Sequence, residues 1–240
     1  MRRLASLALF ASIVAPSAAL ACGASAGGSA TGAACSLGDR THADAMRLGA
    51  TYFYTTTSLR FGDGLSPDER RQGVLATFDR SLSPRLVLQL GLGALVAGDL
   101  RQDGVAYRAG AGPAAAVALT YRLVGDRASD AFVALTGQTT ASTATTEGGG
   151  ERERLSAIDV RIGAVAGIPV AEVLRPFAVA RVFGGPIFWR WHGESRTGTD
   201  AYHYQLGLGA SVAPGAGFDL FFESVLLGER GFSAGVGWRF

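Results

Sequence analysis

The sequence predicts an all-β fold, a transmembrane antiparallel up-and-down β-barrel. In the last strand, every second residue is apolar or aromatic to the end of the chain: Phe232, Ala234, Val236, Trp238 and Phe240. The residues between them are small or charged: Ser233, Gly235, Gly237 and Arg239. The 34 glycines recur at alternate positions of other strand-like runs as well. Because glycine cannot build a hydrophobic core, we expect the large apolar side chains to point outward into lipid.

The first residues predict export from the cytoplasm. A basic start at Arg2 and Arg3 precedes an apolar run over residues 4–14, and Ala19-Leu20-Ala21 is a small-x-small cleavage site. This order is typical of a signal peptide, residues 1–21, and its apolar run is too short to span a membrane. Residues 22–45 show no period and predict a flexible periplasmic tail. The barrel is expected over residues 46–240.

Two cysteines, Cys22 and Cys35, lie in this tail. An oxidising periplasm favours a disulfide between them. Lipidation of Cys22 is the alternative, although no aliphatic residue stands three places before it, as a lipobox usually has. No metal site is predicted, because two cysteines without a neighbouring histidine are too few ligands for zinc.

Charge and hydropathy exclude two classes of function. Removing Arg2 and Arg3 leaves 20 basic residues from 22, which balance the 20 acidic ones. A neutral chain argues against nucleic acid as a partner. Downstream of the signal no apolar window reaches eighteen residues, so only a closed barrel would span a bilayer.

The strands follow one another with little between them. We expect ten: residues 47–61, 72–82, 85–98, 104–124, 130–146, 152–168, 175–191, 200–213, 217–227 and 230–240. Eight or twelve strands remain alternatives, because Pro113 and Gly185-Pro186 each mark a bulge or a break. An even number of strands places both termini on the periplasmic side.

The connections are expected to be short turns on the periplasmic side and longer charged loops outside. The outer loops are residues 62–71, 99–104, 146–152, 192–199 and 228–230. Trp189, Trp191, Tyr202 and Tyr204 are predicted to form an aromatic girdle at one interface.

By these features the chain resembles the small outer-membrane β-barrel proteins of Gram-negative bacteria. The resemblance rests on the signal peptide, the alternating strands and the terminal aromatic pattern, and covers the chain from about residue 47. It implies that Phe232, Val236, Trp238 and Phe240 form the signal read by the barrel-assembly machinery. It also implies outer-membrane lipid and lipopolysaccharide as partners. It specifies no activity, since such barrels serve as structural proteins, channels, adhesins and enzymes.

Ionisable residues alternate onto the inward face. These are Asp79, Asp159, Arg161, Asp219, Glu223 and Arg239. A ten-stranded barrel is narrow enough for side chains to fill, so we expect these charges to pair and plug the lumen. A narrow passive channel for small solutes is the alternative interpretation.

A rim hydrolase is the second alternative. His203 is predicted to face inward near the outer rim, but Ser211 lies roughly 27 Å further along the strand, too far to be its nucleophile. His192, Glu194 and Ser195 share a loop without a predictable geometry. The threonine-rich segment 136–146 and its arginines are interpreted as a solvated hairpin tip. We therefore predict a non-enzymatic structural or surface-interaction barrel with no cofactor.

Overall fold

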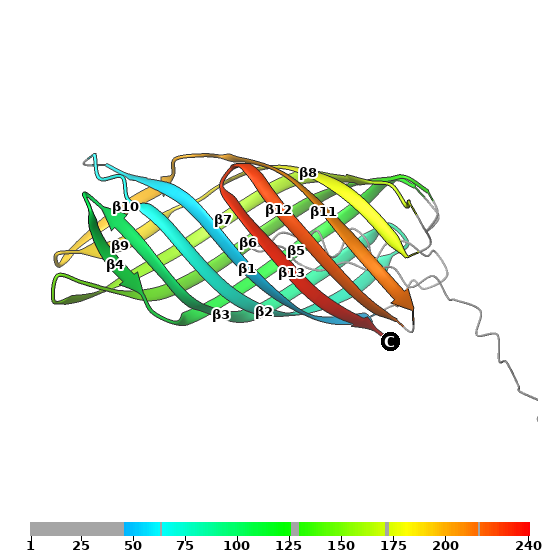
Figure 1. Ribbon diagram of the computed structural model, residues 1–240, viewed down its shortest axis with the longest axis horizontal. Helices are drawn as coiled ribbons and strands as arrows, with labels where there is room; N and C mark the ends of the chain where they lie inside the picture. The colour runs from blue at the N-terminus through cyan, green and yellow to red at the C-terminus, as the bar shows by residue number, and fades with distance from the viewer. Residues whose placement is uncertain (1–45, 63, 126–129, 171–172, 216) are drawn as a thin grey trace, which may run out of the picture.

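The computed structural model describes residues 46–62, 64–125, 130–170, 173–215 and 217–240. The predicted signal peptide and the tail with Cys22 and Cys35 lie outside these residues. Within them the chain forms one antiparallel sheet rolled into a long barrel (Figure 1). No described helix is long and apolar enough to cross a membrane.

Thirteen strands are found among the described residues. They are β1 (Met46–Phe61), β2 (Asp68–Ser83), β3 (Leu86–Gln102), β4 (Val105–Ala109), β5 (Gly112–Val124), β6 (Phe132–Gly148), β7 (Glu151–Gly167), β8 (Leu174–Gly184), β9 (Ile187–Trp191), β10 (Glu194–Asp200), β11 (Tyr204–Gly215), β12 (Phe218–Gly228) and β13 (Arg230–Arg239).

These strands make a ring of ten in the described part of the chain, because β4–β5, β8–β9 and β10–β11 are each one strand with a short break. The ring closes where β13 pairs with β1, from Arg47↔Arg239 to Thr56↔Arg230. The prediction of a ten-stranded antiparallel barrel is confirmed. The breaks after Ala109 and Gly184 lie at the predicted interruptions, next to Pro113 and at Gly185-Pro186.

The third break, at residues 201–203, had no counterpart in the predicted strands. It lies beside the break between β8 and β9, since the Phe183 amide donates to the His203 carbonyl at 2.9 Å. On one side of this break β11 pairs with β12, and on the other side β10 pairs with β1, with Leu59 opposite Asp200. The wall strand formed by β10 and β11 thus changes partner where the hairpin of β12 and β13, here called the short hairpin, ends.

The barrel therefore has two parts along its axis, which differ in their number of strands. Past the short hairpin the described wall is a closed ring of eight strands: β1, β2, β3, β4, β6, β7, β9 and β10. We call this the loop end, on the left of Figure 1, and the end that carries Met46 and Phe240, on the right, the terminal end. The Phe240 amide donates to the Met46 carbonyl, which ties the two ends of the described chain together.

Most loops predicted at the loop end are wrong, because the strands continue through them. Segments 99–104, 146–152 and 192–199 shrink to two-residue turns at Asp103-Gly104, Gly149-Gly150 and His192-Gly193. Both residues of each turn have positive φ, between 50° and 85°. This is the geometry of type I′ turns, whose twist matches that of the strands they join. The long, threonine-rich hairpin of β6 and β7 is accordingly strand almost to its tip.

The outer face is apolar, as the alternation predicts. Leu92 is 70% exposed, Ile162 62% and Leu208 57%, in each case on the outside of the wall. Leu206 and Phe222, whose burial in a core would have contradicted a membrane barrel, are both exposed. Large apolar side chains on the outside of a closed sheet need lipid rather than water around them.

The inner face differs from the prediction in one respect. We expected small and charged residues there, but large apolar side chains also point inward and are buried, in three clusters. Trp189 is the clearest case: it is 1% exposed and lies inside the barrel, so the predicted girdle at that position is wrong. The reason is that a ten-stranded wall leaves only enough room for side chains to fill it.

Inward glycines make room for these large side chains. A Cβ added at Gly235 would lie 2.2 Å from Phe221 Cε1, because the ring of Phe221 covers its cross-strand glycine neighbour. Gly73 stands in the same relation to Phe53. An aromatic ring packed over a facing glycine is a known way to fill a sharply curved sheet. The glycines thus serve packing rather than loop flexibility.

We expect Gly235→Ala to destabilise the barrel by about 1–3 kcal/mol, because the added carbon overpacks the interior. Besides the ring, it would meet the Ala50 carbonyl oxygen at 2.6 Å. The matched control is Gly137→Ala on β6, where an added Cβ meets nothing within 4 Å. Urea unfolding of the refolded protein measures both, and equal effects at the two positions would contradict the packing role.

Candidate functional site: the charged interior of the barrel

The first charged cluster lies inside the terminal end and centres on Arg47 of β1. Its Nε and Nη2 donate to the two carboxylate oxygens of Asp219 at 2.8 and 2.6 Å, and its Nη1 donates to Asp79 at 2.7 Å. Gln89 completes the cluster by donating to the other oxygen of Asp79 at 2.7 Å. All four side chains are at most 3% exposed. One guanidinium therefore bonds to two carboxylates on two different strands, β2 and β12.

The second cluster lies at mid-height and centres on Glu229, the turn residue of the short hairpin. Glu229 is fully buried and points into the barrel. One of its oxygens accepts from Arg71 at 3.2 Å and the other from Arg161 at 2.7 Å. Gln205 donates to the second oxygen as well, and Arg161 also contacts Asp159. A hairpin turn thus places an anion between arginines of two other strands, β2 and β7.

A further ion pair, between Arg181 and Glu223, lies beside the second cluster. Arg181 donates from Nη1 and Nη2 to the two oxygens of Glu223, both at 2.8 Å, which is the bidentate geometry that favours arginine. Arg181 also donates to the amide oxygen of Gln205 at 3.3 Å. Gln205 therefore links this pair to Glu229. The charges at mid-height are therefore held by a connected set of contacts, separate from the first cluster.

Seven buried apolar residues fill the loop end, and we call them the apolar cap: Leu59, Phe61, Leu65, Leu100, Leu155, Ile187 and Trp189. Trp189 is central, since its ring lies 5.8 Å from Phe61 and 5.4 Å from Tyr107, centroid to centroid. Its indole N–H donates to Thr146 Oγ1 at 3.1 Å, so its one polar atom is satisfied. The cap lies inside the narrower, eight-stranded part of the barrel.

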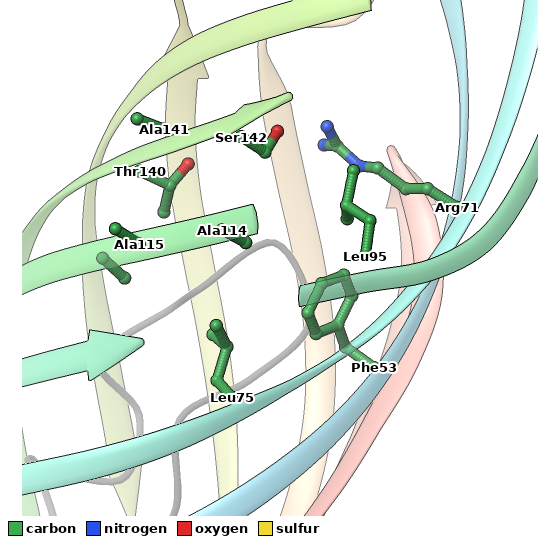
Figure 2. Close-up of a pocket in the computed structure, with 10 residues that line it drawn as sticks. Phe53, Arg71, Leu75, Leu95, Ala114, Ala115, Thr140, Ala141 and Ser142 are labelled. Atoms are coloured by element: carbon green, nitrogen blue, oxygen red, sulfur yellow. The ribbon is translucent and has the colours of Figure 1, made fainter. Parts of the chain in front are cut away.

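A small hollow lies beside Arg71 of the second cluster (Figure 2). Phe53, Leu75 and Leu95 form its apolar side. Arg71 enters it from one side, and Thr140 and Ser142 lie on the other. Its volume of about 30 Å³ is room for two or three waters, since each needs about 10–15 Å³ by this measure. A hollow of this size is too small to be a ligand pocket.

The structure brings five of the six predicted lumen charges into the buried interior: Asp79, Asp159, Arg161, Asp219 and Glu223. Arg239 is only half-buried and lies at the terminal end, opposite Arg47 in the register. Sequence reasoning missed the partners Arg47, Arg71 and Arg181, although each alternates inward in phase with its strand. It also missed Glu229, which carries no periodic signal because it is a turn residue.

The residues considered for catalysis are not brought together. His203 is exposed in the break between β10 and β11, not inward as predicted, and its Nδ1 lies 3.2 Å from the Phe183 carbonyl oxygen. Ser211 is fully buried. His192 contacts Glu151 of the neighbouring hairpin at 3.0 Å rather than Ser195. The described residues include no group of three metal-ligating side chains.

The residues of the proposed assembly signal all point outward from β13 and the chain end. Phe232 is 38% exposed, Val236 41%, Trp238 61% and Phe240 64%. These side chains are therefore available on the outer surface.

Comparisons with known proteins add the following. No protein-family model matches the chain, and no curated protein matches its sequence. The translocator domain of the autotransporter NalP from Neisseria meningitidis is 14% identical, with 81% of this chain and 88% of that chain covered and a TM-score of 0.45. The outer membrane protein OprG from Pseudomonas aeruginosa is 9% identical, with 85% and 98% covered and a TM-score of 0.45. The transport unit of the autotransporter AIDA-I from Escherichia coli is 13% identical, with 80% and 89% covered and a TM-score of 0.44.

The architecture is that of a small outer-membrane β-barrel. This follows from the chain's own geometry: a closed antiparallel wall, a largely apolar exterior and buried charges that pair in the interior.

Proposed function

We propose that this protein is a closed outer-membrane barrel with a structural or cell-surface role, both termini lying in the periplasm. The observation that carries the proposal is the apolar cap, a buried cluster with side chains from β1, β3, β7 and β9 inside the eight-stranded ring. An ion passing these apolar side chains would lose much of its hydration, which costs far more than thermal energy. Two buried carboxylates lie at the same level, Asp200 opposite Leu59 and Glu69 opposite Leu100. Because the ring has ten strands, both ends of the described chain lie at the terminal end, which is the end we assign to the periplasm.

The ion pairs beneath the cap support the same proposal. Each buried charge of the two clusters has an opposite partner within hydrogen-bonding distance, and most of these contacts join strands that are not paired with each other. Such cross-links hold the wall together and leave no row of like charges along which a solute ion would move. We therefore favour the closed barrel over a narrow passive channel.

Planar lipid bilayers test this directly. The purified, refolded protein is expected to insert without producing unitary conductance steps. Steps that change size in Arg161→Gln or Asp219→Asn would contradict the proposal, because they would place those buried charges on an open path. Insertion is checked separately, by the heat-dependent shift in gel migration of the protein recovered from the bilayer lipid.

A catalytic role is not proposed, since His203 and His192 each contact groups other than a nucleophile. If purified protein hydrolyses phospholipid or peptide, and His203→Ala abolishes that activity, this part of the proposal fails.

A further inference from the structure

We propose that the outer face of β13, β1 and β2 is a binding site for a phosphate-bearing acylated glycolipid of the outer leaflet. The inference depends on the outer-membrane assignment and on the orientation given above, but not on whether the barrel conducts. It concerns a face of the wall that the interior clusters do not use.

The charged part of this site is a pair of exposed arginines. Arg70 of β2 and Arg230 of β13 both stand opposite Thr56 of β1, so the three residues lie side by side across three neighbouring strands on the outer face. Neither arginine has a hydrogen bond or ion pair with a described residue. Asp99 stands opposite Arg70 on β3, but it accepts from Arg101 Nε at 3.1 Å. Both guanidinium groups are therefore free to bind an anion.

An aromatic row lies directly beneath the arginines. Two residues nearer the terminal end, Tyr54 stands between Phe232 and Gln72 in the register. The Phe232 ring is stacked with that of Tyr54 at 5.8 Å and with that of Phe222 at 6.3 Å. The Tyr52 hydroxyl donates to Gln72 at 2.7 Å. Aromatic side chains with polar tips are typical of the membrane–water boundary, which fixes the level of Arg70 and Arg230 just above it.

An apolar hollow continues from the aromatic row toward the membrane centre, and we call it the outer hollow. Small residues form its floor: Ala50, Ala76 and Ala234. Larger ones, including Val74, Leu220 and Val236, form its sides. Its volume of about 630 Å³ lies within the roughly 300–1,000 Å³ of typical ligand sites. From the loop end toward the membrane centre, this face thus presents arginines, then aromatic rings, then the outer hollow.

This order matches one kind of occupant. A phosphorylated glycolipid presents its anion at the boundary and its acyl chains below it, so phosphate would meet the arginines while a chain lies in the outer hollow. Arginine offers several donors to the phosphate oxygens. A second copy of this chain fits less well, because a two-fold interface through this face would bring Arg70 and Arg230 against their own copies.

The test uses the full mature protein, in detergent, titrated with bis-phosphorylated lipid A and measured by native mass spectrometry. The double variant Arg70→Gln/Arg230→Gln is expected to bind lipid A roughly thirtyfold more weakly. This figure assumes that each arginine contributes about 1 kcal/mol to binding and that about 1.4 kcal/mol corresponds to a tenfold change in affinity. The control pair Arg152→Gln/Arg190→Gln removes two exposed arginines at the loop end and is expected to change binding less than twofold.

Two further arms identify the chemistry. Phosphatidylglycerol in place of lipid A is expected to show a smaller loss in the double variant, because it offers one phosphate rather than two. Ala50→Leu/Ala234→Leu, which fills the outer hollow, is expected to weaken lipid A binding while leaving both arginines in place. The heat-dependent gel shift checks that each variant is folded.

Equal losses in the test and control pairs would overturn the site, since binding would then follow total charge. Unchanged binding in the test pair would overturn it too. A dimer would also overturn the site if lipid A does not dissociate it and if Ala50→Leu/Ala234→Leu abolishes it. In that case this face would be covered by a second protein molecule. None of these outcomes depends on the conductance measurement, so the two proposals fail separately.

Discussion

Glu229→Gln is expected to lower the free energy of unfolding by roughly 3–5 kcal/mol, which is typical when one partner of a buried ion pair is removed. The substitution keeps the shape of the side chain but leaves Arg71 and Arg161 facing an uncharged group. Arg161 is 2% exposed, so water cannot take over the lost interaction. The midpoint of urea unfolding in lipid vesicles, followed by tryptophan fluorescence, measures the loss.

Two comparisons test whether the loss in Glu229→Gln comes from the burial of its ion pairs. Glu194→Gln also removes a carboxylate that pairs with an arginine, Arg196 at 2.8 Å, but this side chain is 73% exposed. Its effect is expected to stay under about 1 kcal/mol. Adding Arg161→Gln to Glu229→Gln should recover part of the loss, because the two residues are directly coupled. A loss in Glu229→Gln no larger than in Glu194→Gln would show that the interior is hydrated rather than sealed.

Arg47→Met is the second substitution with a large expected effect, again roughly 3–5 kcal/mol of stability. Methionine fills much of the arginine volume but leaves Asp79 and Asp219, which are 2% and 1% exposed, without their common partner. Two carboxylates left in one buried site repel each other as well as losing the guanidinium. Urea unfolding of the refolded variant measures the effect.

The control for Arg47→Met is Arg80→Gln, which removes an exposed arginine at the same end of the barrel. It is expected to change stability by less than about 0.5 kcal/mol. The triple variant Arg47→Met/Asp79→Asn/Asp219→Asn should regain much of the stability, since no unpaired charge is left. If the triple variant were as unstable as Arg47→Met, the loss would come from packing and not from charge.

The site could be predicted only in part, and the reason differs between residues. Asp159 and Arg161 were found because alternation along a strand fixes which face a residue occupies. Their partner Glu229 was not found, because a turn residue has no periodicity and its direction is set by where the short hairpin ends. Trp189 was assigned to the outer surface because its residue type favours an interface, whereas its register on β9 points it inward.

The sequence by itself determined the barrel, a preferred count of ten strands and the outward face of the strands that alternate clearly, because a period of two residues over long runs leaves little freedom in a closed sheet. Only the tertiary structure decided that the wall narrows to eight strands past the short hairpin, and which charges meet inside. Those features depend on the offset between neighbouring strands. That offset adds up around the ring and cannot be found in any one strand.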